Sequence, residues 1–238
     1  MLREYLLFFA RLTIVPVIIA SLIGLTRYRR LPPSLRYLTL LACFDTLMEL
    51  TTIMLGTDIA RKSLKINTNL FLFPFISIGE VTLLALAYRQ VLQSVSFNKI
   101  LPWLLGLFSA YALFVSFSQW GMARYAVCLS TIVNLLLLGL AGLYFRKLLN
   151  ELHVEQLRTD PFFWVSAGLA VYGLGNLLIS LFSNYLITHY SVQLQMIILW
   201  GVRNVFNVIL YLSYCWALWI ASPKSQMEPV AASITPRA

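Results

Sequence analysis

Two acidic residues, Asp45 and Glu49, lie inside one of the most apolar stretches of the chain, CFDTLMEL. In a helix they share one face with Thr52, because the three positions are spaced i, i+4 and i+7. A charged side chain near the centre of a membrane-spanning helix costs roughly 2.5–3.5 kcal/mol, whereas a leucine, isoleucine or phenylalanine contributes only about 0.3–0.6 kcal/mol. The apolar residues of 35–55 therefore barely offset the two acids, so this face is expected to point into a helix bundle and away from lipid.

Further polar residues are expected at a similar depth in other helices. Glu80 shares a face with Ser77, and Arg203 lies close to Asn204 and Asn207 near the end of the chain. Arg203 is the one base expected near mid-depth against three acids, so full ionisation would leave two negative charges uncompensated. A low dielectric disfavours that state, and we expect at least one carboxyl to hold a proton or to be balanced by a bound cation. The predicted ligand- or proton-binding residues are Asp45, Glu49, Glu80, Arg203 and Asn207. The alternative is a network of buried ion pairs and hydrogen bonds that only fixes the packing of the helices.

The composition is that of a membrane protein. Of 238 residues, 60% are hydrophobic and 11% are charged, whereas a soluble domain has about 25% charged residues. A membrane-spanning helix needs about 20 mostly apolar residues. Seven stretches qualify, at approximately 5–25, 35–55, 67–88, 100–118, 123–145, 161–183 and 192–220. We therefore predict one all-α integral membrane bundle of seven transmembrane helices over residues 1–221, followed by a disordered tail over 222–238.

The distribution of basic residues predicts the orientation of the bundle. With the N-terminus outside, eleven lysines and arginines fall on the cytoplasmic side and five on the other. The positive-inside rule then places the N-terminus outside and the C-terminus in the cytoplasm, although the basic loop of residues 61–65 argues against this. No contiguous basic surface exists apart from these anchors, so we expect no nucleic-acid partner.

Several familiar classes of membrane protein are excluded by residues that the chain lacks. Covalent retinal binding needs a lysine deep in the last helix, and all five lysines fall in loops, at helix ends or in the tail. Zinc-dependent membrane hydrolases need several intramembrane histidines, whereas His153 and His189 are both predicted in loops. Ser-His-Asp catalysis at mid-depth fails for the same reason. The spacing of the three cysteines, Cys43, Cys128 and Cys215, indicates neither disulfides nor a zinc site. We predict no enzymatic activity, no cofactor and no metal site.

Three segments spread over most of the chain carry a resemblance to known proteins: RYRRLPPSLRYLTL, NLFLFPFISIGEVTLLAL and FFWVSAGLAVYGLGNLLISLFSNYL. A last helix with asparagines that ends in a tryptophan-rich stretch adds a fourth feature. In these features the chain resembles a group of small bacterial seven-helix membrane proteins of unknown function. The resemblance implies a multi-pass protein of the bacterial cytoplasmic (inner) membrane, and it implies no mechanism.

One connecting segment is expected to reach out of the membrane. RKLLNELHVEQLRTD, residues 146–160, mixes charged residues with leucines and is predicted to extend the fifth helix into the cytoplasm. Apart from membrane lipid, a soluble protein bound at 146–160 is the partner we expect, and a solvated helical hairpin is the alternative. We predict a sensor or signal-transducing module that binds a small ligand or proton at the mid-membrane carboxylate and arginine cluster. The alternatives are a proton- or cation-coupled transporter of a small solute and a structural or assembly factor.

Overall fold

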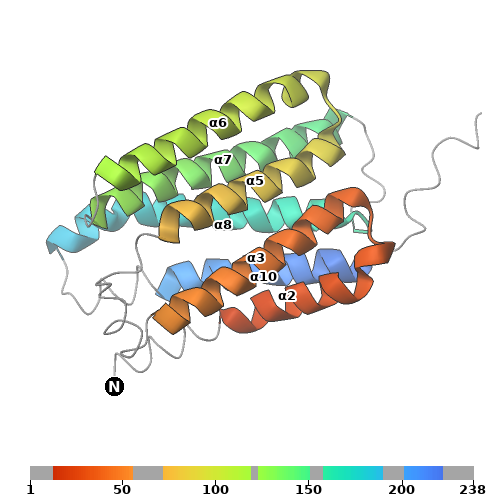
Figure 1. Cartoon of the computed structure of the whole chain (residues 1–238), viewed down its shortest axis with the longest axis horizontal. Coiled ribbons are helices and arrows are strands. Elements are labelled where there is room, and N and C mark those ends of the chain that lie inside the picture. Colours follow the sequence, from red (N-terminus) through yellow and green to blue (C-terminus); the bar gives the residue numbers. More distant parts are fainter. Residues whose placement is uncertain (1–12, 56–71, 119–122, 151–157, 190–200, 222–238) are drawn as a thin grey trace, which may run out of the picture.

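The computed structural model describes residues 13–55, 72–118, 123–150, 158–189 and 201–221. Within these residues the chain forms seven α-helices and no strand, which confirms the predicted all-α fold. The helices are α2 (Ile14–Arg27), α3 (Pro33–Leu55), α5 (Phe73–Leu92), α6 (Val95–Ser118), α7 (Ala123–Asn150), α8 (Pro161–His189) and α10 (Arg203–Ile220), and the short 3-10 helix η1 (Tyr28–Arg30) follows α2 (Figure 1). The predicted tail of residues 222–238 and the whole basic loop of residues 61–65 lie outside the described residues.

The helices have the length and composition of membrane spans. Five are long and apolar enough to cross a membrane, namely α3, α5, α6, α7 and α8. The described parts of α2 and α10 contain 14 and 18 residues. The predicted character of a multi-pass membrane protein is thus supported, whereas the orientation of the bundle stays a prediction.

Six of the helices form a closed ring in which each helix packs against its two neighbours. The order around the ring is α2, α3, α5, α7, α8, α10 and back to α2. The remaining helix, α6, packs on the outside against α5 and α7 and lies along one edge of the molecule in Figure 1. Because α10 is next to α2, the last described helix closes the ring against the first one.

The interior of the ring is apolar at most positions, and so is its outer surface. Fully buried leucines come from most of the ring helices, including Leu38, Leu84, Leu137, Leu169 and Leu218. Other leucines, such as Leu47, Leu107 and Leu181, are 61%, 71% and 74% exposed on the outside. A soluble monomer rarely exposes such an extensive apolar surface, whereas lipid solvates it well.

Local signals set where the helices begin and end. Asp160 caps α8, because its Oδ1 accepts a hydrogen bond of 2.9 Å from the backbone N–H of Phe162. Pro161 follows as the first helical residue, where its missing N–H is not needed, as the sequence predicts. Gln93 ends α5 in the left-handed conformation, with φ 47°, which reverses the chain towards α6. The predicted start of the fourth span near residue 100 was five residues too late, because α6 begins at Val95 and contains Pro102 in its interior.

Candidate functional site

A cavity of about 360 Å³ lies inside the ring between α3, α5, α7, α8 and α10. All five residues predicted for the site line this cavity. Asp45 and Glu49 come from α3, Glu80 from α5, and Arg203 and Asn207 from α10. The structure therefore brings the predicted residues together in one place. The most distant two, Asp45 and Asn207, are 162 positions apart in the chain.

Asp45 is the most buried acid of the cavity, with 7% of its surface exposed. Its Oδ2 accepts a hydrogen bond of 2.9 Å from the Tyr211 hydroxyl, which crosses from α10 to α3. The neighbouring inward positions of α3, Leu41 and Ala42, are fully buried, so the rotation of this helix is set by its apolar residues and carries Asp45 inward. Glu49, one turn further along α3, is half-buried at the cavity wall.

Arg203 bonds to a hydroxyl across the cavity. Its Nη2 donates a hydrogen bond of 2.7 Å to Ser130 Oγ on α7. Asn134 Nδ2, one turn along α7, donates to the same oxygen at 3.4 Å. Within the described residues Arg203 makes no ion pair with a carboxylate, although it attracts Glu80 electrostatically over a longer distance. Of the alternative network of buried ion pairs and hydrogen bonds, hydrogen bonds are therefore present, and direct ion pairs are absent among the described side chains.

The acids of the cavity repel one another. Asp45 interacts unfavourably with both Glu80 and Glu49, which lie close to it on α5 and α3. Arg203 is the one basic side chain that lines the cavity in the described part of the chain, against three carboxyl groups. Like charges held together at low dielectric favour the uptake of a proton or of a positively charged ligand. The geometry thus provides a site where positive charge is stabilised.

Some residues of the cavity were not identified from the sequence. Tyr172 of α8 and Ser130 of α7 line the wall, and Ser130 accepts a hydrogen bond from Arg203, the one base among the described residues of the cavity. A serine or a tyrosine is an ordinary residue in a membrane helix, and only the i, i+4 spacing of Ser130 and Asn134 gives a signal. Asn204, which the sequence groups with Arg203 and Asn207, does not line the cavity.

A column of buried hydroxyl groups continues from the cavity along the bundle. We call it the hydroxyl column and define it by Tyr211, Tyr214, Tyr88, Ser166 and Tyr144. The ring of Tyr211, which bonds Asp45, meets the ring of Tyr214 edge to face with centroids 5.7 Å apart. The Tyr214 hydroxyl is buried, and within the described residues it has no hydrogen-bond partner. Tyr88, the next tyrosine of the column, belongs to α5.

The second half of the hydroxyl column reaches the start of α8. The Tyr88 hydroxyl shares a hydrogen bond of 2.7 Å with Ser166 Oγ. The rings of Tyr88 and Tyr144 are in edge contact at 6.5 Å, and the Tyr144 hydroxyl donates a hydrogen bond to Asp160. Eight residues of α5 separate Glu80 from Tyr88, which is about 12 Å at 1.5 Å per residue. The column therefore joins the cavity to the end of the bundle at which α8 begins.

No three histidine, cysteine, aspartate or glutamate residues of the described ranges are arranged to hold a metal ion. Cys43, Cys128 and Cys215 are free thiols. The carboxylates, amides and hydroxyls of the cavity are suited to binding a proton or a small ligand by charge and hydrogen bonding.

An all-α bundle hosts many functions, so fold by itself assigns none, and function has to be argued from the site. Comparison with other proteins adds no assignment. No protein-family model matches the chain, and no curated protein and no solved structure is similar to it.

Proposed function

We propose that the protein is a small sensor of the bacterial cytoplasmic membrane, whose cavity binds a proton or a small positively charged ligand. One observation carries the proposal: among the described residues, three carboxyl groups and a single guanidinium line the same cavity, and the guanidinium is bonded to Ser130. Binding of a positive charge relieves the repulsion between Asp45, Glu49 and Glu80. The orientation with the N-terminus outside belongs to the same proposal.

The size and the wall of the cavity favour a compact organic cation as the ligand. The volume of about 360 Å³ is at the lower end of the range of about 300–1,000 Å³ that small-molecule sites have. The aromatic rings of Phe73, Tyr172 and Tyr211 line the wall and can face an ammonium group, as in other cation sites. Carboxylates together with aromatic rings select an amine over an anion or a neutral sugar.

Binding has a direct structural consequence for the helices of the ring. A cation bonded to Asp45 competes with Tyr211, whose hydrogen bond links α10 to α3. Because α10 also packs against α8 and α2, a shift of α10 changes its contacts with three helices, α3, α8 and α2. The sensor is proposed to signal through a soluble partner bound at residues 146–160, of which the structure describes residues 146–150 at the end of α7 and residues 158–160.

The experiment that tests ligand binding uses the full chain in phosphatidylcholine nanodiscs, with methylammonium and putrescine as probes. Bound ligand stabilises the folded state in proportion to the logarithm of its concentration, so the Tm of the native protein should rise with added probe. The variant Asp45→Asn/Glu80→Gln should lose this rise. Ser116→Ala, which removes a buried hydroxyl of α6 away from the cavity, is the matched control and should keep it. An equal rise in Tm for the native protein and for Asp45→Asn/Glu80→Gln would exclude the cavity as the binding site.

The hydroxyl column supports a second candidate function, a proton- or cation-coupled transporter. A transporter needs a polar route from its site to the other side of the membrane, and buried tyrosine and serine hydroxyls of this kind offer one. In liposomes with a trapped pH dye, the transporter predicts proton movement that Tyr88→Phe and Glu80→Gln reduce. Tyr37→Phe, which removes the hydroxyl of a half-buried tyrosine outside the column, is the control. A flux equal to that of empty liposomes would leave the sensor as the proposal.

If neutral variants of the acids change thermal stability alone, an assembly factor is favoured.

A further inference from the structure

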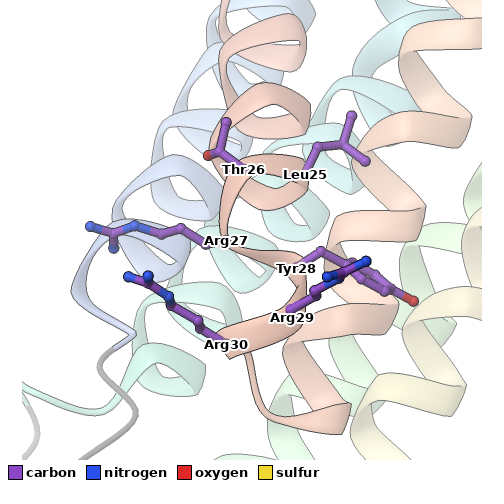
Figure 2. A pocket seen from close by; sticks show the side chains of 6 residues that line it. All are labelled: Leu25, Thr26, Arg27, Tyr28, Arg29 and Arg30. Carbon is purple, nitrogen blue, oxygen red and sulfur yellow. The ribbon is translucent and has the colours of Figure 1, made fainter.

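A second pocket, unrelated to the cavity, lies at the turn between α2 and α3. It has a volume of about 490 Å³ and is lined by Leu25, Thr26, Arg27, Tyr28, Arg29 and Arg30. In Figure 2 the side chains of Arg27 and Arg30 extend to one side of the turn, and those of Tyr28 and Arg29 extend to the other. Three guanidinium groups thus surround a short stretch of backbone, and no carboxylate from the described part of the chain lines the pocket.

The backbone of this turn is held by interactions that leave two arginines uncommitted. Arg36 Nε donates a hydrogen bond of 2.9 Å to the Leu31 carbonyl, and Arg36 Nη2 donates one of 3.5 Å to the Arg29 carbonyl. The Arg36 guanidinium also lies over the Tyr28 ring, 5.8 Å from its centroid. Within the described residues the guanidinium groups of Arg29 and Arg30 are exposed and make neither a hydrogen bond nor an ion pair.

Arg27 is anchored at the side of the pocket that faces α10. Its Nη1 donates a hydrogen bond of 2.6 Å to the Trp219 carbonyl, and its guanidinium lies 4.9 Å from the centroid of the Trp219 ring. A guanidinium has five N–H donors, so most of them remain for a ligand. The end of α10 therefore orients Arg27 in advance, which lowers the entropy lost when a ligand binds.

The charge of the turn has no local compensation in the sequence. No aspartate or glutamate occurs between Glu4 and Asp45, while four arginines, Arg27, Arg29, Arg30 and Arg36, fall within ten residues of one another. Guanidinium groups in a cluster recognise phosphate by paired hydrogen bonds as well as by charge. An anionic phosphate is thus the ligand class that fits the pocket.

The position of the pocket distinguishes a lipid phosphate from a soluble one. The tryptophans Trp164 and Trp216 are in ring contact at 6.2 Å at the same end of the bundle, next to Trp219, and tryptophan is enriched where a membrane meets water. On the membrane side of the arginines, Leu22 and Leu25 are 55% and 56% exposed and offer an apolar surface to acyl chains. A phospholipid satisfies both surfaces at once, with its phosphate on the arginines and its chains on the leucines.

We infer that the turn of residues 25–30 is a binding site for the headgroup of an anionic phospholipid, with the phosphate held by Arg27 and Arg30 on one side of the turn and with Arg29 adding positive charge from the other side. This site is independent of the proposed sensor, because it shares no residue with the carboxylate cavity. It assigns to the turn a defined lipid ligand in addition to a role in membrane orientation.

Native mass spectrometry of the full chain, released from phosphatidylcholine nanodiscs with added phosphatidylglycerol, tests the inference. The native protein should retain phosphatidylglycerol in preference to phosphatidylcholine. The variant Arg29→Gln/Arg30→Gln should bind phosphatidylglycerol about 25-fold more weakly, since each basic residue near a charged membrane surface contributes roughly fivefold in affinity. Because neither side chain bonds to the rest of the described protein, circular dichroism and Tm should stay those of the native chain.

Two further variants and one added anion make the outcome decisive. Arg89→Gln/Arg158→Gln removes two exposed charges elsewhere and should leave the affinity unchanged. Arg30→Lys keeps the charge but loses the paired geometry, and its affinity should lie between those of the native protein and the double variant. Equal retention of phosphatidylglycerol by Arg29→Gln/Arg30→Gln and the native protein would overturn the inference. Binding of inorganic phosphate in pure phosphatidylcholine nanodiscs, if lost in the same variant, would assign the pocket to a soluble anion and would overturn the lipid assignment.

Discussion

Tyr211 and Asp45 form a hydrogen bond of 2.9 Å that joins the last described helix to α3 across the interior of the ring. Both residues are buried, and among the described residues this is the one side-chain hydrogen bond that either of them makes. A buried polar group that is left without a partner destabilises the folded state by about 1–3 kcal/mol, which is more than an average hydrogen bond contributes. A change at the Asp45 carboxyl group is therefore expected to change the stability of the bundle as well.

Removal of the Tyr211 hydroxyl should destabilise the protein. We expect Tyr211→Phe to lower the free energy of unfolding by about 1–3 kcal/mol, because Asp45 then lacks its donor. Denaturant unfolding in mild detergent measures the change, with Tyr37→Phe as the control. In a double-mutant cycle, Tyr211→Phe should cost much less in the Asp45→Asn background. Additive effects of the two substitutions would contradict a direct interaction between them.

Loss of the only described base of the cavity should strengthen the binding of cations. Arg203→Gln removes the positive charge that attracts Glu80, so the cavity becomes more negative. Arg203 is exposed, so solvent screens its charge and the effect is small. We expect methylammonium to bind to Arg203→Gln up to roughly fivefold more tightly than to the native protein. Isothermal titration calorimetry in nanodiscs measures the affinity. The double variant Arg203→Gln/Glu80→Gln should return it towards the native value, and weaker binding to Arg203→Gln would count against a cation site.

Proton concentration should compete with the cationic ligand. A carboxylate that is protonated loses its attraction for an ammonium group, so the affinity for methylammonium is expected to fall as the pH falls. The measurement is the dissociation constant in nanodiscs over a series of pH values at which the Tm without ligand shows the protein folded. In Asp45→Asn/Glu80→Gln the remaining pH dependence should be smaller. An affinity that rises towards acid pH would show that ionised carboxylates do not hold the ligand.

The contact between α8 and α10 depends on a glycine. A Cβ at Gly168 would collide with the side chain of Ser213, whereas a Cβ at Gly106 on α6 would meet no atom within 4 Å. Gly168→Ala should therefore destabilise the bundle by about 1–3 kcal/mol, as overpacking does in other cores. Gly106→Ala should be neutral or stabilising, because alanine is the better helix former. Ser213→Gly in combination with Gly168→Ala should restore part of the stability, and thermal unfolding followed by circular dichroism measures all three.

Helix number and the inward direction of the acids could be predicted from the sequence. Apolar runs of about 20 residues are an unambiguous signal in a chain with so few charges. Asp45 and Glu49 could be placed on an inward face, because a charge that faces lipid is unfavourable whichever helices surround it. The helix ends were predicted less well, as the early start of α6 at Val95 shows, because polar residues such as Asn98 and Lys99 can extend a helix beyond its apolar part.

Only the tertiary structure decided which side chains meet. The order of helices around the ring places α10 next to α8 and α2 and brings α7 to the cavity, and no local pattern encodes that order. As a result Arg203 bonds Ser130 and makes no ion pair with an acid of the cavity, and Tyr211 is the donor that reaches Asp45. Hydropathy and helical period determine how each helix faces lipid, whereas partners across the bundle depend on the packing and rotation of every helix in the ring. The sequence therefore determined that the acids face inward, and the packing of the ring decided what surrounds them.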